Sequence, residues 1–195
     1  MNHTLMEMPS SSLLKKLEIG SGNRPKTGYV HLDIKDFDDG KTDIIWDATK
    51  TPYPFKDEEF SEIYSQWVLE HFALRDLERI VLEWKRLLKL RGKIVAITNN
   101  QLAHNRCLKE GKITWTEWIK LTYGIKENED FIKKGLPIPK KVSVFECHKS
   151  AWSVESAFTF FLKLGFDVTI KSGWKCREVN GELKCPGLTI EATKL

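Results

Sequence analysis

The sequence predicts an α/β fold, with a mostly parallel sheet of seven strands, an antiparallel last strand and an insert on the rim of the sheet. Three observations lead to this fold class. Short apolar runs recur along the chain and end at turn residues. Two segments, residues 74–90 and 153–165, have the three- and four-residue apolar spacing of amphipathic helices. Residues 99–150 interrupt this alternation of strands and helices, which is typical of a parallel sheet with helical crossovers.

Each expected strand is short and is followed by a turn signal or a helix. The strands are expected in KKLEI, GYVHLD, TDIIWD, Ser61–Ser65, KIVAIT, FDVTI and LTIEA. The helix over residues 74–90 is expected to end before Gly92, because glycine is favoured just beyond helix C-termini. Ser153 is expected to cap the N-terminus of the next helix and Gly165 its C-terminus. No helical pattern separates the last two strands, so they are expected to pair as an antiparallel hairpin at one edge.

The composition excludes several classes of protein. The chain has 195 residues, of which 41% are hydrophobic and 30% charged, so it has the apolar content of a folded domain. No stretch reaches the roughly 20 apolar residues of a membrane helix, and the start lacks the pattern of a signal peptide. We therefore expect a cytoplasmic protein with one domain over residues 1–195, which includes an N-terminal arm over residues 1–14.

The four cysteines do not predict a metal site. They are Cys107, Cys147, Cys176 and Cys185, and no two of them form a CxxC pair. The gap between Cys176 and Cys185 does not match the common zinc spacings. We expect reduced thiols, and a Cys176–Cys185 disulfide is the alternative.

The residues at the ends of the first four strands describe a nucleoside site. Ligands of open α/β sheets bind beyond the C-terminal ends of the strands. The first strand runs into a glycine turn, which lets a ligand approach the backbone closely. Asp33 ends the second strand, where a carboxylate can accept both hydroxyls of a ribose. Asp47 ends the third strand, where a carboxylate can accept from an exocyclic amine. Alternatively, either aspartate is a turn residue only.

The strand-end motifs LEIGSG, HLDI, IWDAT and YSQWVLEHF together resemble those of class I S-adenosylmethionine-dependent methyltransferases. KRLLKLRGKIVAI and SAFTFFLKLGFDV resemble later parts of the same family, and the resemblance covers roughly residues 15–100 and 150–194. It implies a Rossmann-like sheet, S-adenosylmethionine as cofactor and methyl transfer as the activity.

The resemblance also implies roles for individual residues. The methionine end of the cofactor would be lined by Glu18, Gly20, Ser21 and Gly22. Asp33 would bind the ribose, while Asp47 and the Ala48 N–H would bind adenine. Ser65 and Gln66 would face the sulfonium and the methyl group, and Trp67 and Val68 would pack against adenine or the substrate mouth.

The sequence departs from this family at the first crossover. Asp33 follows Gly20 by thirteen residues, which leaves no room for the usual first helix. One subgroup of the family has this shortened form, and the N-terminal arm would then cover the exposed face. A nicotinamide-dependent oxidoreductase is a weaker alternative, because the turn GSGNRP lacks the third glycine and the following helix that hold a pyrophosphate.

Several histidines and acids are candidates for catalysis. His71 is the candidate base or orienting group for the acceptor, and the alternative is that Glu70 and His71 only begin a helix. His104, Glu146 and His148 flank the insert, and each is either a surface residue or a further candidate for catalysis. Trp115 and Trp118 lie on an expected helix near Thr114–Tyr123, and form either a small satellite core or an aromatic wall for the acceptor.

The insert carries the excess positive charge of the chain. Residues 101–150 contain ten Lys or Arg and six Asp or Glu, whereas the rest of the chain balances to zero. We expect the insert over residues 99–150 to overhang the ligand end of the sheet and to contact an acceptor, which this charge favours as anionic. No motif of amino-methylating DNA enzymes or C5-pyrimidine enzymes is present, so a small molecule with an O or N nucleophile is preferred. The alternatives are an RNA or protein acceptor, or a non-catalytic cofactor-binding or partner subunit.

Overall fold

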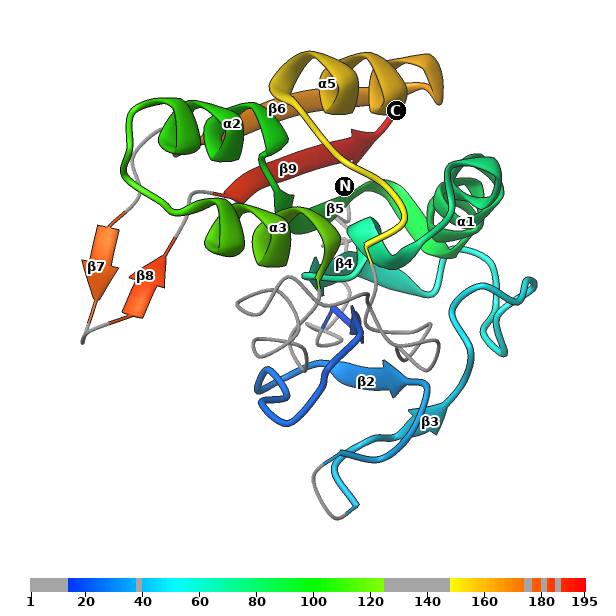
Figure 1. The fold of residues 1–195 in the computed structure, drawn as a ribbon. Helices are drawn as coiled ribbons and strands as arrows, with labels where there is room; N and C mark the ends of the chain where they lie inside the picture. The colour runs from blue at the N-terminus through cyan, green and yellow to red at the C-terminus, as the bar shows by residue number, and fades with distance from the viewer. Residues whose placement is uncertain (1–13, 38–39, 125–147, 174–176, 180–181, 185–186) are drawn as a thin grey trace, which may run out of the picture.

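The computed structural model describes residues 14–37, 40–124, 148–173, 177–179, 182–184 and 187–195. Its centre is a seven-stranded sheet with the order β3-β2-β1-β4-β5-β9-β6 (Figure 1). The predicted seven-stranded α/β sheet is therefore confirmed. No helix in these described ranges is both long and apolar enough to cross a membrane.

Five parallel strands form one side of the sheet. β1 pairs with β2 and β4, β2 pairs with β3, and β4 pairs with β5, always in parallel. The C-terminal ends of these strands therefore meet at one edge of the sheet, where ligands of such sheets bind. Their bounds are β1 Lys16–Ile19, β2 Val30–Asp33, β3 Ile44–Ile45, β4 Phe60–Gln66 and β5 Leu88–Asn99. Residues 20–29 form turns without a helix, as the short spacing predicts.

The last two strands of the sheet lie beside β5. β9 (Gly187–Lys194) pairs antiparallel with both β5 and β6 (Phe166–Ser172), so β6 is the edge strand. The predicted antiparallel pair is confirmed. α5 (Val154–Lys163) precedes β6, and the Ser153 side chain caps it by accepting from the Ser156 N–H. The loop between β6 and β9 contains a small hairpin, β7 (Arg177–Val179) and β8 (Glu182–Lys184), which the sequence analysis does not predict.

The helix α1 is shorter than its sequence pattern predicts. It covers Leu74–Leu87, and Leu88 already begins β5, where it pairs with Phe60 of β4. The predicted end near residue 90 is therefore wrong, because sheet pairing takes over residues that also suit a helix. The apolar face of α1 is buried against the sheet, and Trp84 in its last turn is fully buried.

The insert contains two helices in its described part. α2 (Gln101–Lys109) begins directly after β5 and was not predicted, whereas α3 (Trp115–Tyr123) matches the expected helix. Thr114 and Glu117 form a capping box at the start of α3. Glu146 and all of the predicted N-terminal arm except residue 14 lie outside the described residues.

Glu83 on α1 connects the helix to the loop before β4, and its charge is expected to stabilise the fold. Its carboxylate accepts from the Tyr53 N–H at 2.6 Å and from two nitrogens of Arg86 at 2.6 and 2.9 Å. Burial alone raises the pKa of Glu83, but these donors outweigh it and hold the pKa below its usual value. A depressed folded-state pKa gives stability that is present above the unfolded pKa and is lost as the pH falls through the folded one.

We therefore expect Glu83→Gln to lower the free energy of unfolding by about 1–2 kcal/mol at pH 7, because hydrogen bonds to a charged group are the stronger ones. The loss should shrink as the pH falls below about 4, where the unfolded carboxyl is protonated. Urea unfolding of both proteins at pH 7 and pH 3.5 measures this. The matched control is Glu78→Gln on the exposed face of α1. A deficit for Glu83→Gln that is equal at both pH values would contradict the assignment.

Candidate functional site

A glycine turn between β1 and β2 forms the centre of the site. Gly20 has a φ of +75°, which favours glycine, and its N–H donates to the Leu32 carbonyl at 2.8 Å. A Cβ at Gly20 would lie 2.3 Å from Cγ2 of Val68, so the chain after β4 packs directly against this turn. The turn therefore has no room for a side chain at this position.

Asp33 and Asp47 lie at neighbouring strand ends beside the turn. One Asp33 oxygen accepts from the Gly22 N–H at 2.7 Å and the other from the Ile34 N–H at 2.6 Å. The Trp46 N–H donates to the Asp33 carbonyl at 2.7 Å, which joins the two strand ends. A carboxylate has about four acceptor positions, so Asp33 retains capacity for hydroxyls of a ligand. The structure thus brings the two predicted aspartates together.

Asp47 is organised by its own turn. Its Oδ1 accepts from the backbone N–H of Thr49 at 2.9 Å and from the Thr49 hydroxyl at 2.7 Å. The carbonyl of Ala48 accepts from the Tyr53 hydroxyl, which in turn accepts from Trp84 Nε1. The turn that carries Asp47 and Ala48 is therefore held in place by hydrogen bonds to buried aromatic side chains.

Glu18 is buried and makes its described polar contacts within the protein. Its Oε2 accepts from the Lys26 N–H at 2.7 Å and lies 2.9 Å from Nδ1 of His31. These contacts close the segment that replaces the first crossover helix. Glu18 therefore shapes the turn on which the predicted methionine end of the cofactor would lie.

Several buried polar atoms near this edge have no hydrogen-bond partner among the described residues. They belong to Ser21 after β1, Ser65 on β4 and Asn99 at the end of β5. An unsatisfied buried polar group costs about 1–3 kcal/mol, so such a concentration is typical of a ligand site. The amino and carboxylate groups of a bound methionine moiety have the chemistry to satisfy these atoms. The predicted cofactor therefore fits the residues present, and Asn99 is a candidate that the sequence analysis missed although it also ends a strand.

Gln66 and Trp67 come from the C-terminal end of β4 and the residue that follows it. Gln66 is exposed and accepts from the Tyr64 hydroxyl at 2.7 Å. Trp67 has a φ of +56° and is 44% exposed, and its ring lies within 3.0 Å of the position that a Cβ of Gly187 would take. Because β9 and β2 are on opposite sides of β4, this position suits the substrate mouth better than adenine.

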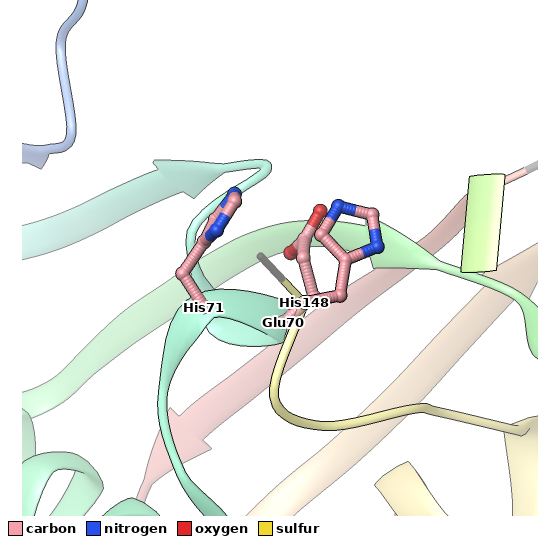
Figure 2. A group of neighbouring side chains, drawn as sticks. All are labelled: Glu70, His71 and His148. Atoms are coloured by element: carbon pink, nitrogen blue, oxygen red, sulfur yellow. The ribbon is translucent and has the colours of Figure 1, made fainter. Parts of the chain in front are cut away.

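Three side chains gather just beyond β4, as Figure 2 shows. Glu70 and His71 come from the 3-10 helix η1 (Leu69–His71), and His148 comes from the chain returning from the insert. Each offers a ligand atom, and these atoms all lie within 4.8 Å of one another. Burial raises the pKa of Glu70 to about 7, partly offset by hydrogen bonds that include the Thr98 hydroxyl at 2.8 Å. In the sequence, Glu70 and His71 are adjacent whereas His148 is far away, and no metal site is predicted from their pattern.

The insert contributes further groups around His148. His104 on α2 is buried, and burial together with the neighbouring His148 lowers its pKa to about 4, so it is neutral at pH 7. Trp115 and Trp118 stack with ring centroids 4.8 Å apart, and Trp115 is 60% exposed. No residue of α3 is buried, so the satellite-core interpretation of the two tryptophans is wrong.

One thiol differs from expectation. Cys107 on α2 is buried and disulfide-bonded, so the expectation of reduced thiols is wrong for this residue. Cys147, Cys176 and Cys185 lie outside the described residues.

Asp47→Asn is expected to weaken cofactor binding less than Asp33→Ala does. The amide keeps the shape and one acceptor oxygen of Asp47 and loses only the charge, whereas alanine at position 33 removes every acceptor. Calorimetric titration with S-adenosylhomocysteine, with folding checked by circular dichroism, measures both affinities. If folded Asp47→Asn is the weaker binder of the two, Asp47 and not Asp33 is the principal anchor.

Part of the chain matches a known family model. Residues 9–96 match a family model described as a methyltransferase domain. No curated protein matches the sequence.

Solved structures with the same fold extend over nearly the whole chain. An S-adenosylmethionine-dependent methyltransferase from Methanosarcina mazei has a TM-score of 0.61 at 17% identity, over 93% of this chain and 92% of that one. One from Archaeoglobus fulgidus has a TM-score of 0.60 at 15% identity, over 94% and 87%. The CurJ carbon methyltransferase has a TM-score of 0.58 at 15% identity and covers 97% of this chain, which matches 50% of CurJ. At these identities the similarity concerns the fold.

Proposed function

We propose that this protein transfers a methyl group from S-adenosylmethionine to an O or N nucleophile of a small-molecule acceptor. Residues 9–96 match a model of a methyltransferase domain, and the fold is that of solved S-adenosylmethionine-dependent methyltransferases. The observation that carries the proposal is the strand edge itself. There hydrogen bonds join the glycine turn to Asp33 and Asp33 to the strand end before Asp47. Buried polar atoms of Ser21, Ser65 and Asn99, which follow or end the neighbouring strands β1, β4 and β5, have no partner in the described chain.

In this proposal, different residues at this edge bind different parts of the cofactor. Asp33 would hold the ribose hydroxyls, and Asp47 with the Ala48 N–H would hold adenine. Gly20, Ser21 and Gly22, shaped by Glu18, would line the methionine end. Ser65 and Gln66 would lie at the methyl-bearing end, with Trp67 at the acceptor mouth. S-adenosylmethionine supplies a methyl group on a sulfonium, which an acceptor lone pair takes as the carbon–sulfur bond breaks with its electrons on sulfur.

The chain itself has to align the acceptor and receive or release its proton. Alignment and exclusion of water account for much of the rate enhancement in such a transfer. His71 is the residue we propose to act on the acceptor, as a base or as an orienting group. It follows Val68, Leu69 and Glu70 in the chain. Val68 packs against the glycine turn and the other two are fully buried, so buried contacts set the position of His71 relative to the proposed cofactor site.

Two measurements test the proposal. Calorimetry with S-adenosylmethionine, S-adenosylhomocysteine and NAD should show binding of the first two only; binding of NAD alone would overturn the cofactor assignment. A screen for methyl release over acceptors with O, N and C nucleophiles then separates catalysis from a non-catalytic cofactor-binding subunit. Turnover confined to carbon acceptors, the chemistry named for CurJ, would contradict the preferred nucleophile.

We also propose that residues 99–150 select the acceptor and do not hold the cofactor. In support, α2 starts where β5 ends, and the stacked Trp115 and Trp118 present an exposed aromatic surface. The positive charge of this segment favours an anionic acceptor. The cytoplasmic location expected from the sequence stays a prediction.

Replacing Lys133, Lys134, Lys140 and Lys141 by glutamine should leave the affinity for S-adenosylhomocysteine within about threefold, or about 0.7 kcal/mol. These lysines lie outside the described residues, and the expectation rests on their charge in the sequence. Binding of a polyanionic acceptor should weaken and lose much of its salt dependence. A folded quadruple variant that loses the cofactor would assign the insert to the cofactor site.

A further inference from the structure

The cluster of Glu70, His71 and His148 combines the ligand types of a transition-metal site. It has one carboxylate and two imidazoles, with ligand atoms that all lie within 4.8 Å of one another. Two ligands of one tetrahedral zinc ion lie about 3.4 Å apart, given metal–ligand bonds of about 2.1 Å. Modest side-chain rotations therefore suffice to bring the three groups around a shared ion.

The Glu70 carboxylate is buried and only partly hydrogen-bonded, which favours a bound cation. Its side chain is fully buried, and Thr98 donates to Oε2 at 2.8 Å. Oε1 is buried as well and has no hydrogen-bond partner among the described residues. Leaving a carboxylate oxygen unsatisfied in the interior is costly, and coordination to a metal is one of the ways in which proteins compensate a buried charge.

Hydrogen bonds from outside the cluster orient His148 and Glu70, as is usual for metal ligands. His148 Nδ1 lies 3.2 Å from the carbonyl oxygen of Thr122, while its other ring nitrogen lies on the side of the Glu70 carboxylate (Figure 2). Metal-binding histidines usually donate their second N–H to a carbonyl or carboxylate, which sets the tautomer and the ring orientation. Thr98 supplies the corresponding hydrogen bond to the carboxylate.

Backbone hydrogen bonds join the two segments that carry the ligands. The N–H groups of Lys149 and Ser150 donate to the Glu70 carbonyl at 2.6 and 3.1 Å, and the Ser150 hydroxyl donates to the Leu69 carbonyl at 3.0 Å. The His71 and His148 rings meet edge to face with centroids 5.1 Å apart. Ligands that are distant in sequence are thus held in one place by the fold.

From this arrangement we propose that Glu70, His71 and His148 bind a divalent transition-metal ion, with Zn²⁺ as the best-matched ion. A set of two histidines and one carboxylate is typical of zinc sites with an open position and of related first-row metal sites. Mg²⁺ and Ca²⁺ prefer all-oxygen ligands and fit less well.

The site lies next to the proposed cofactor edge, and its use in catalysis rests on the proposed function. Three protein ligands leave at least one position for an oxygen of the acceptor. The metal would lower the pKa of a hydroxyl bound there. In that case His71 orients the acceptor through the metal and does not itself take the proton.

Metal binding alone tests the site. The full chain, stripped of metal by chelation and dialysis, is titrated with Co²⁺ and with Zn²⁺, while visible absorption and calorimetry are recorded. We expect one equivalent to bind, with d–d absorption bands for Co²⁺. His148→Ala and Glu70→Gln should weaken binding at least about tenfold, since even groups that only support ligands typically contribute that much. Metal-free unfolding curves establish that both variants fold, and His148→Asn serves if the alanine variant does not.

His31→Ala is the matched control, because His31 is a partly buried histidine paired with a carboxylate elsewhere. It should bind the metal like the parent protein. The proposal is overturned if the folded parent binds no metal, or if folded His148→Ala binds it with unchanged affinity. S-adenosylhomocysteine affinity, measured on the same samples without metal, reports separately on the proposed function.

Discussion

Replacing Asp33 by alanine is expected to lower the affinity for S-adenosylhomocysteine at least tenfold. The carboxylate would lose its hydrogen bonds to the ribose, each worth roughly 1.5–3 kcal/mol when one partner is charged, and tenfold corresponds to about 1.4 kcal/mol. The same substitution releases the Gly22 N–H, which Asp33 holds at 2.7 Å, so the glycine turn also loses a support. Isothermal calorimetry on folded protein measures the effect.

Asp167→Ala is the control for removing a carboxylate, because Asp167 is exposed on the edge strand β6. It should leave the affinity unchanged. Asp33→Asn, which keeps one acceptor oxygen, should lie between the parent and the alanine variant. Unchanged affinity in a folded Asp33→Ala protein would remove Asp33 from the cofactor site.

Gly20→Ala is expected to be among the most damaging single substitutions in the chain. A non-glycine residue at a φ of +75° costs roughly 1–3 kcal/mol. The new Cβ would also lie 2.3 Å from Val68 Cγ2, and overpacking of this kind costs a further 1–3 kcal/mol or so. We expect the free energy of unfolding to fall by about 2 kcal/mol or more, and cofactor binding to weaken because the turn shifts. Urea unfolding and calorimetry measure the two effects.

Gly22→Ala separates backbone strain from the clash. Gly22 also has a positive φ, of 56°, but a Cβ there would meet nothing within 4 Å. Its substitution should therefore cost only about 1–2 kcal/mol. In the double variant Gly20→Ala with Val68→Ala, the clash is relieved, so it should be less destabilised than the sum of the single variants. Strict additivity would show that Val68 does not contact this turn as described.

The sequence predicts which residues lie at the ligand edge of the sheet, because each is tied to a local signal, and their binding of the cofactor stays a prediction. Gly20 and Gly22 stand in a turn after a short apolar run, and Asp33 and Asp47 each end such a run. Parallel strands bring their C-terminal ends to one edge, so strand-end residues that are far apart along the chain become neighbours without any knowledge of side-chain packing. The capped start of α5 at Ser153 was predictable for the same reason, since capping depends on three or four consecutive residues.

Other features were decided only by tertiary contacts. α1 ends at Leu87 because Leu88 pairs with Phe60 of β4, although residues 88–90 suit either structure equally well. Trp115 could be assigned to a core or to a surface only once α3 was placed with no buried residue. His148 meets Glu70 and His71 because backbone hydrogen bonds join the segment after the insert to the 3-10 helix after β4. The sequence by itself determined the local turns, caps and strand ends, whereas the burial of Glu70 and its grouping with two histidines depend on long-range packing, which no short sequence window encodes.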